Sequence, residues 1–211
     1  MSDKKIINVW DPIIRIGHWT IVIAFFTAYF TGDDWMTQHT WAGYILFAVI
    51  VIRILWGFIG GQYARFTQFI YKPRTILTYL KNLIARKPQH YIGHNPAGGV
   101  MVIALLVCLL IATLSGMKLY AVEENKGPIA TIQQMQSANS KMEANIEPNQ
   151  KYLVNEEDEE FWEEIHETFV NITLLLVFLH IGGIMISRII DKENLLKAMF
   201  TGKKEIDNQF K

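Results

Sequence analysis

One apolar segment near the carboxyl end constrains the fold of the 211-residue chain more than any other feature. From Thr168 to Ile186 it contains no Asp, Glu, Lys or Arg, so it can cross a bilayer hydrocarbon core of about 30 Å. His166 and His180 lie 14 residues apart, close to four helical turns, which places both side chains on one helix face. An ionisable side chain inside a membrane span is costly, so this helix is a candidate binding site.

Three further apolar segments have the length of a membrane span. We expect helices over about residues 13–31, 40–59, 97–118 and 163–188. Charged residues make up 19% of the chain, against about 25% in soluble proteins, as expected of a membrane protein. No small-residue cleavage site follows the first apolar run, so the sequence predicts a retained helix there and a single transmembrane domain over residues 1–211.

Charge is segregated between the two long loops. From Arg53 to Pro96 there are seven Lys or Arg and no Asp or Glu, whereas residues 118–164 carry eleven acidic side chains against four Lys. The positive-inside rule predicts that the basic loop and both termini are cytoplasmic and that the acidic loop, about residues 119–161, lies outside. Within the basic loop, an amphipathic helix over about 73–86 is expected on the anionic inner surface. The middle of the acidic loop, about 125–150, has no persistent period, and we expect a partner to order it.

Depth sorts four histidines into two pairs. With four spans in this orientation, His18 lies toward the cytoplasm and His39 toward the outside, while the last helix runs from His166 outside to His180 inside. The predicted pairs are therefore His39 with His166 and His18 with His180. Imidazole is a common axial ligand of haem iron, and no Cys-x-x-Cys-His motif is present to attach haem covalently. The sequence thus predicts an all-α, integral membrane, up-and-down four-helix bundle that encloses two b haems.

Simpler explanations exist for several of these residues. His18 can instead hydrogen-bond a neighbouring helix. Arg53, which follows His39 by 14 residues, can bind a haem propionate or extend to the nearby helix end. Cys108 lies in an apolar run and is expected to be a small core residue. Small residues near the histidines can leave room for porphyrin edges, or let helices approach without any cofactor: Gly43, Gly182 and Gly183.

A glycine-rich stretch from Gly93 to Gly99 precedes the third span. His94 and Asn95 within it are candidates for a quinone site, because quinone chemistry needs hydrogen-bonding groups near a haem. The same stretch can also act simply as a cap that starts the third helix. As haem ligands, His90 and His94 are weaker candidates, since the membrane interface solvates a histidine without any iron.

Several motifs occur in a fixed order along the chain: Val-Trp-Asp-Pro-Ile-Ile-Arg-Ile-Gly-His-Trp from residue 9, His-Thr-Trp-Ala-Gly-Tyr from residue 39, Arg-Ile-Leu-Trp-Gly from residue 53, Ala-Arg-Phe from residue 64, the Gly93 to Gly99 stretch, and the helix from His166 to His180. This set resembles the bacterial cytochrome b561 family. Within the family, it is most similar to the b-type cytochrome subunits that serve nickel–iron hydrogenases and periplasmic c-type cytochromes. By matched position, the resemblance implies haem ligands at His18, His39, His166 and His180.

The resemblance also implies a function. It implies a di-haem b cytochrome of the bacterial inner membrane that links the quinone pool to a periplasmic redox partner. The expected partner is a c-type cytochrome or a hydrogenase small subunit, and we expect it to bind the acidic outer loop. The length of this loop distinguishes the chain from shorter members of the family. The chain would then be an electron-transfer subunit with no bond-making catalytic residue.

Two other functions remain open. Some family members resemble a superoxide oxidase, which passes electrons from superoxide to quinone, but an acidic outer face would repel that anion. A haem-free transporter or scaffold is the third hypothesis. Membrane lipid and quinone are further expected partners, nucleic acid is not, and a homodimer is left open.

Overall fold

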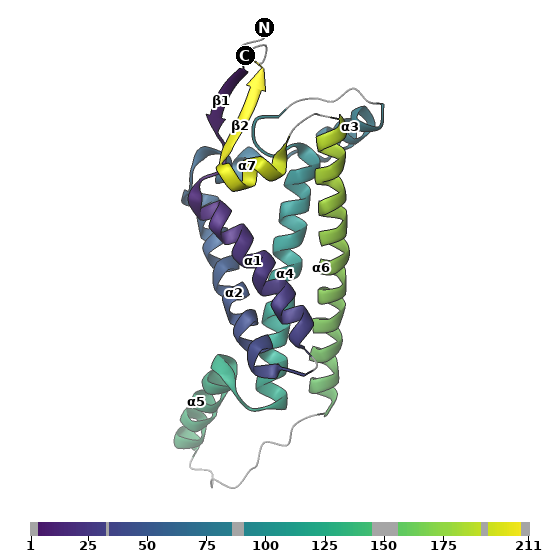
Figure 1. Ribbon diagram of the computed structural model, residues 1–211. Helices are drawn as coiled ribbons and strands as arrows, with labels where there is room; N and C mark the ends of the chain where they lie inside the picture. Colours follow the sequence, from purple (N-terminus) through teal and green to yellow (C-terminus); the bar gives the residue numbers. More distant parts are fainter. Residues whose placement is uncertain (1–3, 33, 86–90, 145–155, 191–193, 208–211) are drawn as a thin grey trace. The chain divides into compact units, whose positions relative to one another are not determined.

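The computed structural model describes residues 4–32, 34–85, 91–144, 156–190 and 194–207 (Figure 1). Long helices cover the four predicted apolar segments, and all four are long and apolar enough to cross a membrane. The last of them begins at Glu156, earlier than the expected residue 163, so the acidic cluster forms its first turns, where negative charge complements the helix dipole. The bounds are α1 (Pro12–Thr31), α2 (Met36–Ile59), α4 (Pro96–Glu123) and α6 (Glu156–Ile190).

Two of these helices begin at an Asx-Pro pair. The Asp11 Oδ1 atom accepts a hydrogen bond of 3.0 Å from the Ile14 amide, and the Asn95 Oδ1 atom accepts one of 2.7 Å from the Gly98 amide. Each cap satisfies an amide that has no partner inside the helix, and the following proline has a backbone angle suited to the first turn. The sequence therefore fixes the start of both spans.

Short helices fill the basic loop: η1 (Gln62–Ala64), η2 (Phe66–Gln68) and α3 (Pro73–Ile84). Helix α3 lies where an amphipathic helix is predicted. Its Tyr79 side chain is buried, whereas Leu77 and Ile84 are exposed. Its location on a membrane surface stays a prediction.

A pair of strands, which the sequence analysis does not predict, joins the two ends of the described chain. Strand β1 (Lys4–Asn8) is antiparallel to β2 (Lys203–Asp207), with Lys4 opposite Asp207 (Figure 1). Between α7 (Leu195–Thr201) and β2, Gly202 adopts a φ of +78°, a left-handed conformation that favours glycine. The described part of the chain is therefore helical with one two-stranded sheet, not all-α as the sequence predicts.

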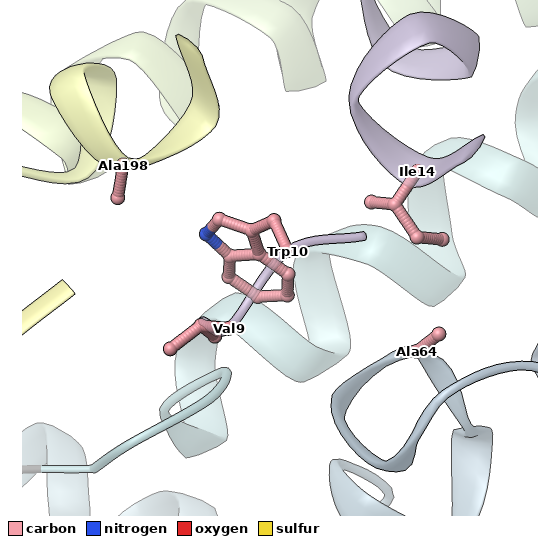
Figure 2. Packing of buried hydrophobic residues seen from close by; sticks show 5 residues of the cluster. All are labelled: Val9, Trp10, Ile14, Ala64 and Ala198. Carbon is pink, nitrogen blue, oxygen red and sulfur yellow. The ribbon is translucent and has the colours of Figure 1, made fainter. Parts of the chain in front are cut away.

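Next to this sheet lies a small apolar core, which we call the terminal cluster: Val9, Trp10, Ile14, Ala64 and Ala198. Figure 2 shows the Trp10 ring in the middle of these side chains. The amide groups of Val9 and Trp10 both donate to the Gly202 carbonyl, at 2.9 and 3.2 Å. The terminal cluster thus fastens the start of α1 to the carboxyl-terminal segment.

Helices α1 and α2 pack against each other and are joined by hydrogen bonds at both ends. Near the start of α1, the Trp56 Nε1 atom donates to the Asp11 Oδ2 atom at 3.0 Å. Near the connecting loop, the His39 Nδ1 atom bonds the Ala28 carbonyl oxygen at 2.9 Å. These two bonds fix the register between the first two spans.

The chain divides into two compact units, residues 1–107 with 174–211, and residues 108–173. The second unit contains helix α5 (Gly127–Ala144) within the acidic loop, where the sequence analysis expects an unordered segment. That expectation was wrong for residues 127–144, whose apolar Ala130 side chain is buried; residues 145–150 lie outside the described chain. A helix with few apolar residues gives little periodic signal, which explains the error.

Candidate functional site

His18 and His180 face each other inside the first unit. Helix α1 carries His18 and helix α6 carries His180, and their ring centroids are 6.4 Å apart with an angle of 49° between the ring planes. The His18 Nδ1 atom is buried and has no hydrogen-bond partner among the described residues. The structure therefore brings together the two histidines that the depth argument pairs.

The separation of these rings fits a shared metal. A metal between two imidazoles lies about 2.0 Å from each nitrogen, and each nitrogen lies about 1.1 Å from its ring centre, so two opposed rings have centroids roughly 6.2 Å apart. The observed 6.4 Å matches this arrangement. Two imidazoles joined directly by a nitrogen-to-nitrogen hydrogen bond of about 2.9 Å have ring centroids roughly 5.1 Å apart. The observed separation is too long for such a bond.

His39 is oriented by the neighbouring helix α1. Its Nδ1 atom lies 2.9 Å from the Ala28 carbonyl oxygen. A carbonyl oxygen only accepts hydrogen bonds, so Nδ1 carries the proton and the neutral ring has its lone pair on Nε2. This is the tautomer of an imidazole that binds a metal through Nε2.

His166 is oriented in the same way within the second unit. Its Nδ1 atom lies 2.8 Å from the Ala112 carbonyl oxygen of α4. Gly116, one turn further along α4, leaves space for the ring, because a Cβ atom there would lie 2.7 Å from His166 Cε1. His39 and His166 belong to different units, so their pairing stays a prediction.

Arg53, in the carboxyl-terminal half of α2, lies over two aromatic rings. Its Cζ atom is 5.2 Å from the Phe66 ring centroid and 5.9 Å from that of Phe69, within the range of cation–π interactions. The Nη1 atom is buried and has no hydrogen-bond partner among the described residues. Gly57 allows this packing, since a Cβ atom there would overlap the Phe66 ring.

The His94 imidazole packs between two aromatic rings. Its centroid is 4.5 Å from that of Trp10 and 4.5 Å from that of Phe69, and its Nδ1 atom is buried without a hydrogen-bond partner among the described residues. Burial, helped by the positive charge of Arg53, lowers the pKa of His94 to about 3. The ring is therefore neutral at physiological pH.

Asn95 has a structural role, since its Oδ1 atom caps α4. The loop around it is held by two further bonds, from the Tyr71 hydroxyl to the His94 carbonyl at 3.1 Å and from Lys204 Nζ to the Tyr91 carbonyl at 2.5 Å. His90 lies outside the described residues.

Sequence reasoning missed the groups that orient the histidines. Ala28 and Ala112 act through their backbone carbonyls, and a backbone group leaves no signal in residue type. Gly116 carries a weak signal as a glycine in an apolar span, but the sequence does not say which side chain it faces. Asp11 was detectable, because an Asp-Pro pair before an apolar run marks a helix start.

Four described helices have the length and apolarity of membrane spans, and three of them, α1, α2 and α6, carry the four histidines described above. The family model of prokaryotic cytochrome b561 matches residues 9–202, so the chain belongs to the prokaryotic cytochrome b561 family. Together with the four apolar helices, this membership makes it a multi-pass bacterial membrane protein of a cytochrome family.

Curated relatives agree with this assignment. The chain is 25% identical to a probable Ni/Fe-hydrogenase B-type cytochrome subunit of Rhizobium leguminosarum bv. viciae, over 56% of this chain and 62% of the relative. It is 26% identical to the protein of the same description from Azotobacter vinelandii, over 54% of this chain and 60% of that relative. A probable Ni/Fe-hydrogenase 1 B-type cytochrome subunit of Escherichia coli (strain K12) is 25% identical, over 54% of this chain and 60% of that relative.

The chain thus spans about three fifths of the length of these relatives. No solved structure matches it.

The contact between Gly116 and His166 is testable. In Gly116→Ala, the new methyl group must displace the imidazole or the helix, and we expect a loss of about 1–3 kcal/mol in the free energy of unfolding. Gly32→Ala is the matched control, because its Cβ atom would lie 3.6 Å from His39 Nδ1, an ordinary contact. The measurement is thermal or denaturant unfolding in one detergent. Equal stability of the two variants would contradict the assigned contact.

Proposed function

We propose that this protein carries electrons across the bacterial inner membrane and holds two haem b groups, each between two histidines. His18 and His180 would bind one haem, and His39 and His166 the other. The observation that carries this proposal is the 6.4 Å separation of the His18 and His180 rings, which suits one iron between them.

The residues present fit haem better than a bare metal ion. Among the described residues, no three His, Cys, Asp or Glu side chains gather as a metal site. A pair of imidazoles completes the coordination only of a metal that brings its other ligands, as porphyrin iron does. Glycines close to the ligands also leave space, since a Cβ atom at Gly43, Gly182 or Gly183 would meet no atom within 4 Å.

Haem b, when bound, supplies one-electron reduction and oxidation. The protein residues hold and tune it. The Ala28 and Ala112 carbonyls orient His39 and His166 and increase the basicity of their Nε2 atoms. We further propose that Arg53 binds a haem propionate, because its buried Nη1 atom needs an acceptor.

We propose an up-and-down bundle of the four spans, with both termini in the cytoplasm. The pairing of β1 with β2 supports the placement of both strands on the same side of the membrane. The basic loop from Arg53 to Pro96 and the acidic residues before and within α6 support the direction, by the positive-inside rule. In this orientation the haem between His18 and His180 is the inner one.

The two haems can be separated by mutation. His180→Ala should remove the inner haem only, so the haem content of the purified protein falls by about half, because His39 and His166 still bind the other. His18→Ala should give the same optical spectrum as His180→Ala, and His39→Ala the complementary one. The measurement is haem quantitation with a redox difference spectrum. Retention of both haems in His180→Ala would reject this ligand assignment.

We propose a quinone site beside His94, in the stretch from Gly93 to Gly99. Support comes from the His94 Nδ1 atom, a buried hydrogen-bonding group with no partner among the described residues. Asn95 would position the loop through its cap on α4 and offer its side-chain amide as a second donor.

Three variants separate these roles. His94→Ala should slow haem reduction by a quinol at least tenfold, since the hydrogen bond to the quinone is lost. Asn95→Asp keeps the cap but removes the amide donor, whereas Asn95→Ala removes both. The measurement is quinol-dependent haem reduction in detergent, with haem content as the folding control. Wild-type rates and affinities in both His94→Ala and Asn95→Ala would exclude this site.

We propose a basic redox protein as the external partner. The relatives are described as Ni/Fe-hydrogenase subunits, which favours a hydrogenase, and a c-type cytochrome has the same electrostatic requirement. Support comes from acidic side chains exposed at the start of α6, which attract a positively charged surface: Glu157, Asp158, Glu160, Glu163, Glu164 and Glu167.

Neutralising Glu157, Asp158 and Glu160 as amides should lower the rate of electron exchange with a basic c-type cytochrome about tenfold at low salt. High salt should abolish the difference, because it screens exposed charges. Stopped-flow haem oxidation over a salt series measures this. A wild-type rate independent of salt, together with rapid haem reduction by superoxide, would favour a superoxide oxidase instead.

A further inference from the structure

The first unit buries several polar side-chain atoms that have no hydrogen-bond partner among the described residues. A buried polar group without a partner is destabilising, so such atoms point to a missing ligand. Five such atoms belong to this unit: Arg15 Nε, His18 Nδ1, Trp19 Nε1, Arg53 Nη1 and His94 Nδ1. The Arg and Trp nitrogens carry protons and accept no hydrogen bond, so these three atoms can only donate.

Arg15 lies one helical turn before His18 and Trp19 on α1. Residues three and four positions apart are neighbours on a helix surface, so Arg15 lies one turn from both His18 and Trp19. The rings of His18 and Trp19 contact each other edge to face, with centroids 5.2 Å apart. Two unpaired donors therefore lie beside the proposed ligand of the inner haem.

The carboxyl-terminal segment holds both side chains in place. The Trp19 ring stacks on Phe200 of α7, with centroids 4.5 Å apart and 24° between the planes. The Arg15 guanidinium lies against Gly202, where a Cβ atom would be 2.7 Å from Arg15 Nη1. Arg15 thus lies under protein, and its buried Nε atom does not reach solvent.

Within the described part of the chain, no acceptor lies within hydrogen-bond distance of these donors. Asp11, the acidic residue that caps α1, already accepts at both oxygens, from the Ile14 amide at Oδ1 and from Trp56 at Oδ2. An anion bound from outside the chain would supply such an acceptor, and Arg with a second N–H donor is a common carboxylate site.

We propose that Arg15 and Trp19 donate hydrogen bonds to one carboxylate of the inner haem, while Arg53 serves the other. Haem b carries two propionates, so two separate cationic donors on α1 and α2 match the number of carboxylates. This inference rests on the proposed haem between His18 and His180. It gives α7 and Gly202 a role, which is to fix the orientation of the α1 donors.

The sharpest variant is Trp19→Phe, which keeps an aromatic ring against Phe200 and removes only the N–H donor. Arg15→Met removes the charge at similar length, and Arg15→Lys restores it. Trp41→Phe and Arg188→Met are matched controls, because both wild-type side chains are exposed. The readouts are the propionate bending bands in the resonance Raman spectrum and the midpoint potential of the inner haem.

We expect Trp19→Phe and Arg15→Met to shift the propionate bands of one haem, with no shift in either control. Arg15→Met should also lower the inner midpoint potential, since a nearby cation favours the reduced state, and Arg15→Lys should recover part of it. A merely structural role for Arg15 would change stability without changing these bands.

Unchanged bands in both Trp19→Phe and Arg15→Met, with two haems still bound, would overturn the inference and leave the proposed function intact. Unchanged bands with loss of co-purified anionic phospholipid would also overturn it, because the acceptor would then be a lipid phosphate. If Arg15→Met cannot be purified, Trp19→Phe decides. Absence of a haem between His18 and His180 in the wild-type protein would instead reject the proposed function.

Discussion

An imidazole within an apolar helix needs a hydrogen-bonding or metal partner. The first unit contains two such imidazoles close together, those of His18 and His180. His18 and His180 face each other at a centroid distance of 6.4 Å, too far for a direct nitrogen-to-nitrogen hydrogen bond and suited to an iron between them. In a membrane span, a polar group without a partner is costly because no water can replace it. The membership in the prokaryotic cytochrome b561 family supports the proposal that this partner is haem iron.

Helix α1 carries His18 and contacts both α2 and the carboxyl-terminal segment. Its cap, Asp11, bonds Trp56 of α2, and the carbonyl of Ala28 near its other end orients His39. The terminal cluster then fastens the start of α1 to α7 and the strand pair. A displacement of α1 along its axis would therefore disturb the surroundings of both His18 and His39.

The spans could be predicted from the sequence because they depend on residue type and spacing, and the same reasoning predicts the proximity of His18 and His180 that the structure shows. Length and apolarity define a span, and a spacing of 14 residues places His166 and His180 on one face. The contacts that orient the imidazoles could not be predicted in this way. The carbonyls of Ala28 and Ala112 belong to the backbone, and the role of Gly116 depends on which helix packs against it. Strands β1 and β2 pair residues from opposite ends of the chain, and such long-range pairing leaves no local pattern.

The central claim is that each of two haems is held by two histidines, and the axial ligands of the wild-type protein test it most directly. Haem quantitation, combined with low-temperature electron paramagnetic resonance and near-infrared magnetic circular dichroism, reports the number of haems and the ligands of each iron. The account predicts two haem b groups per chain, both low-spin with two imidazole ligands. One haem per chain, or a methionine or water ligand on either iron, would contradict it.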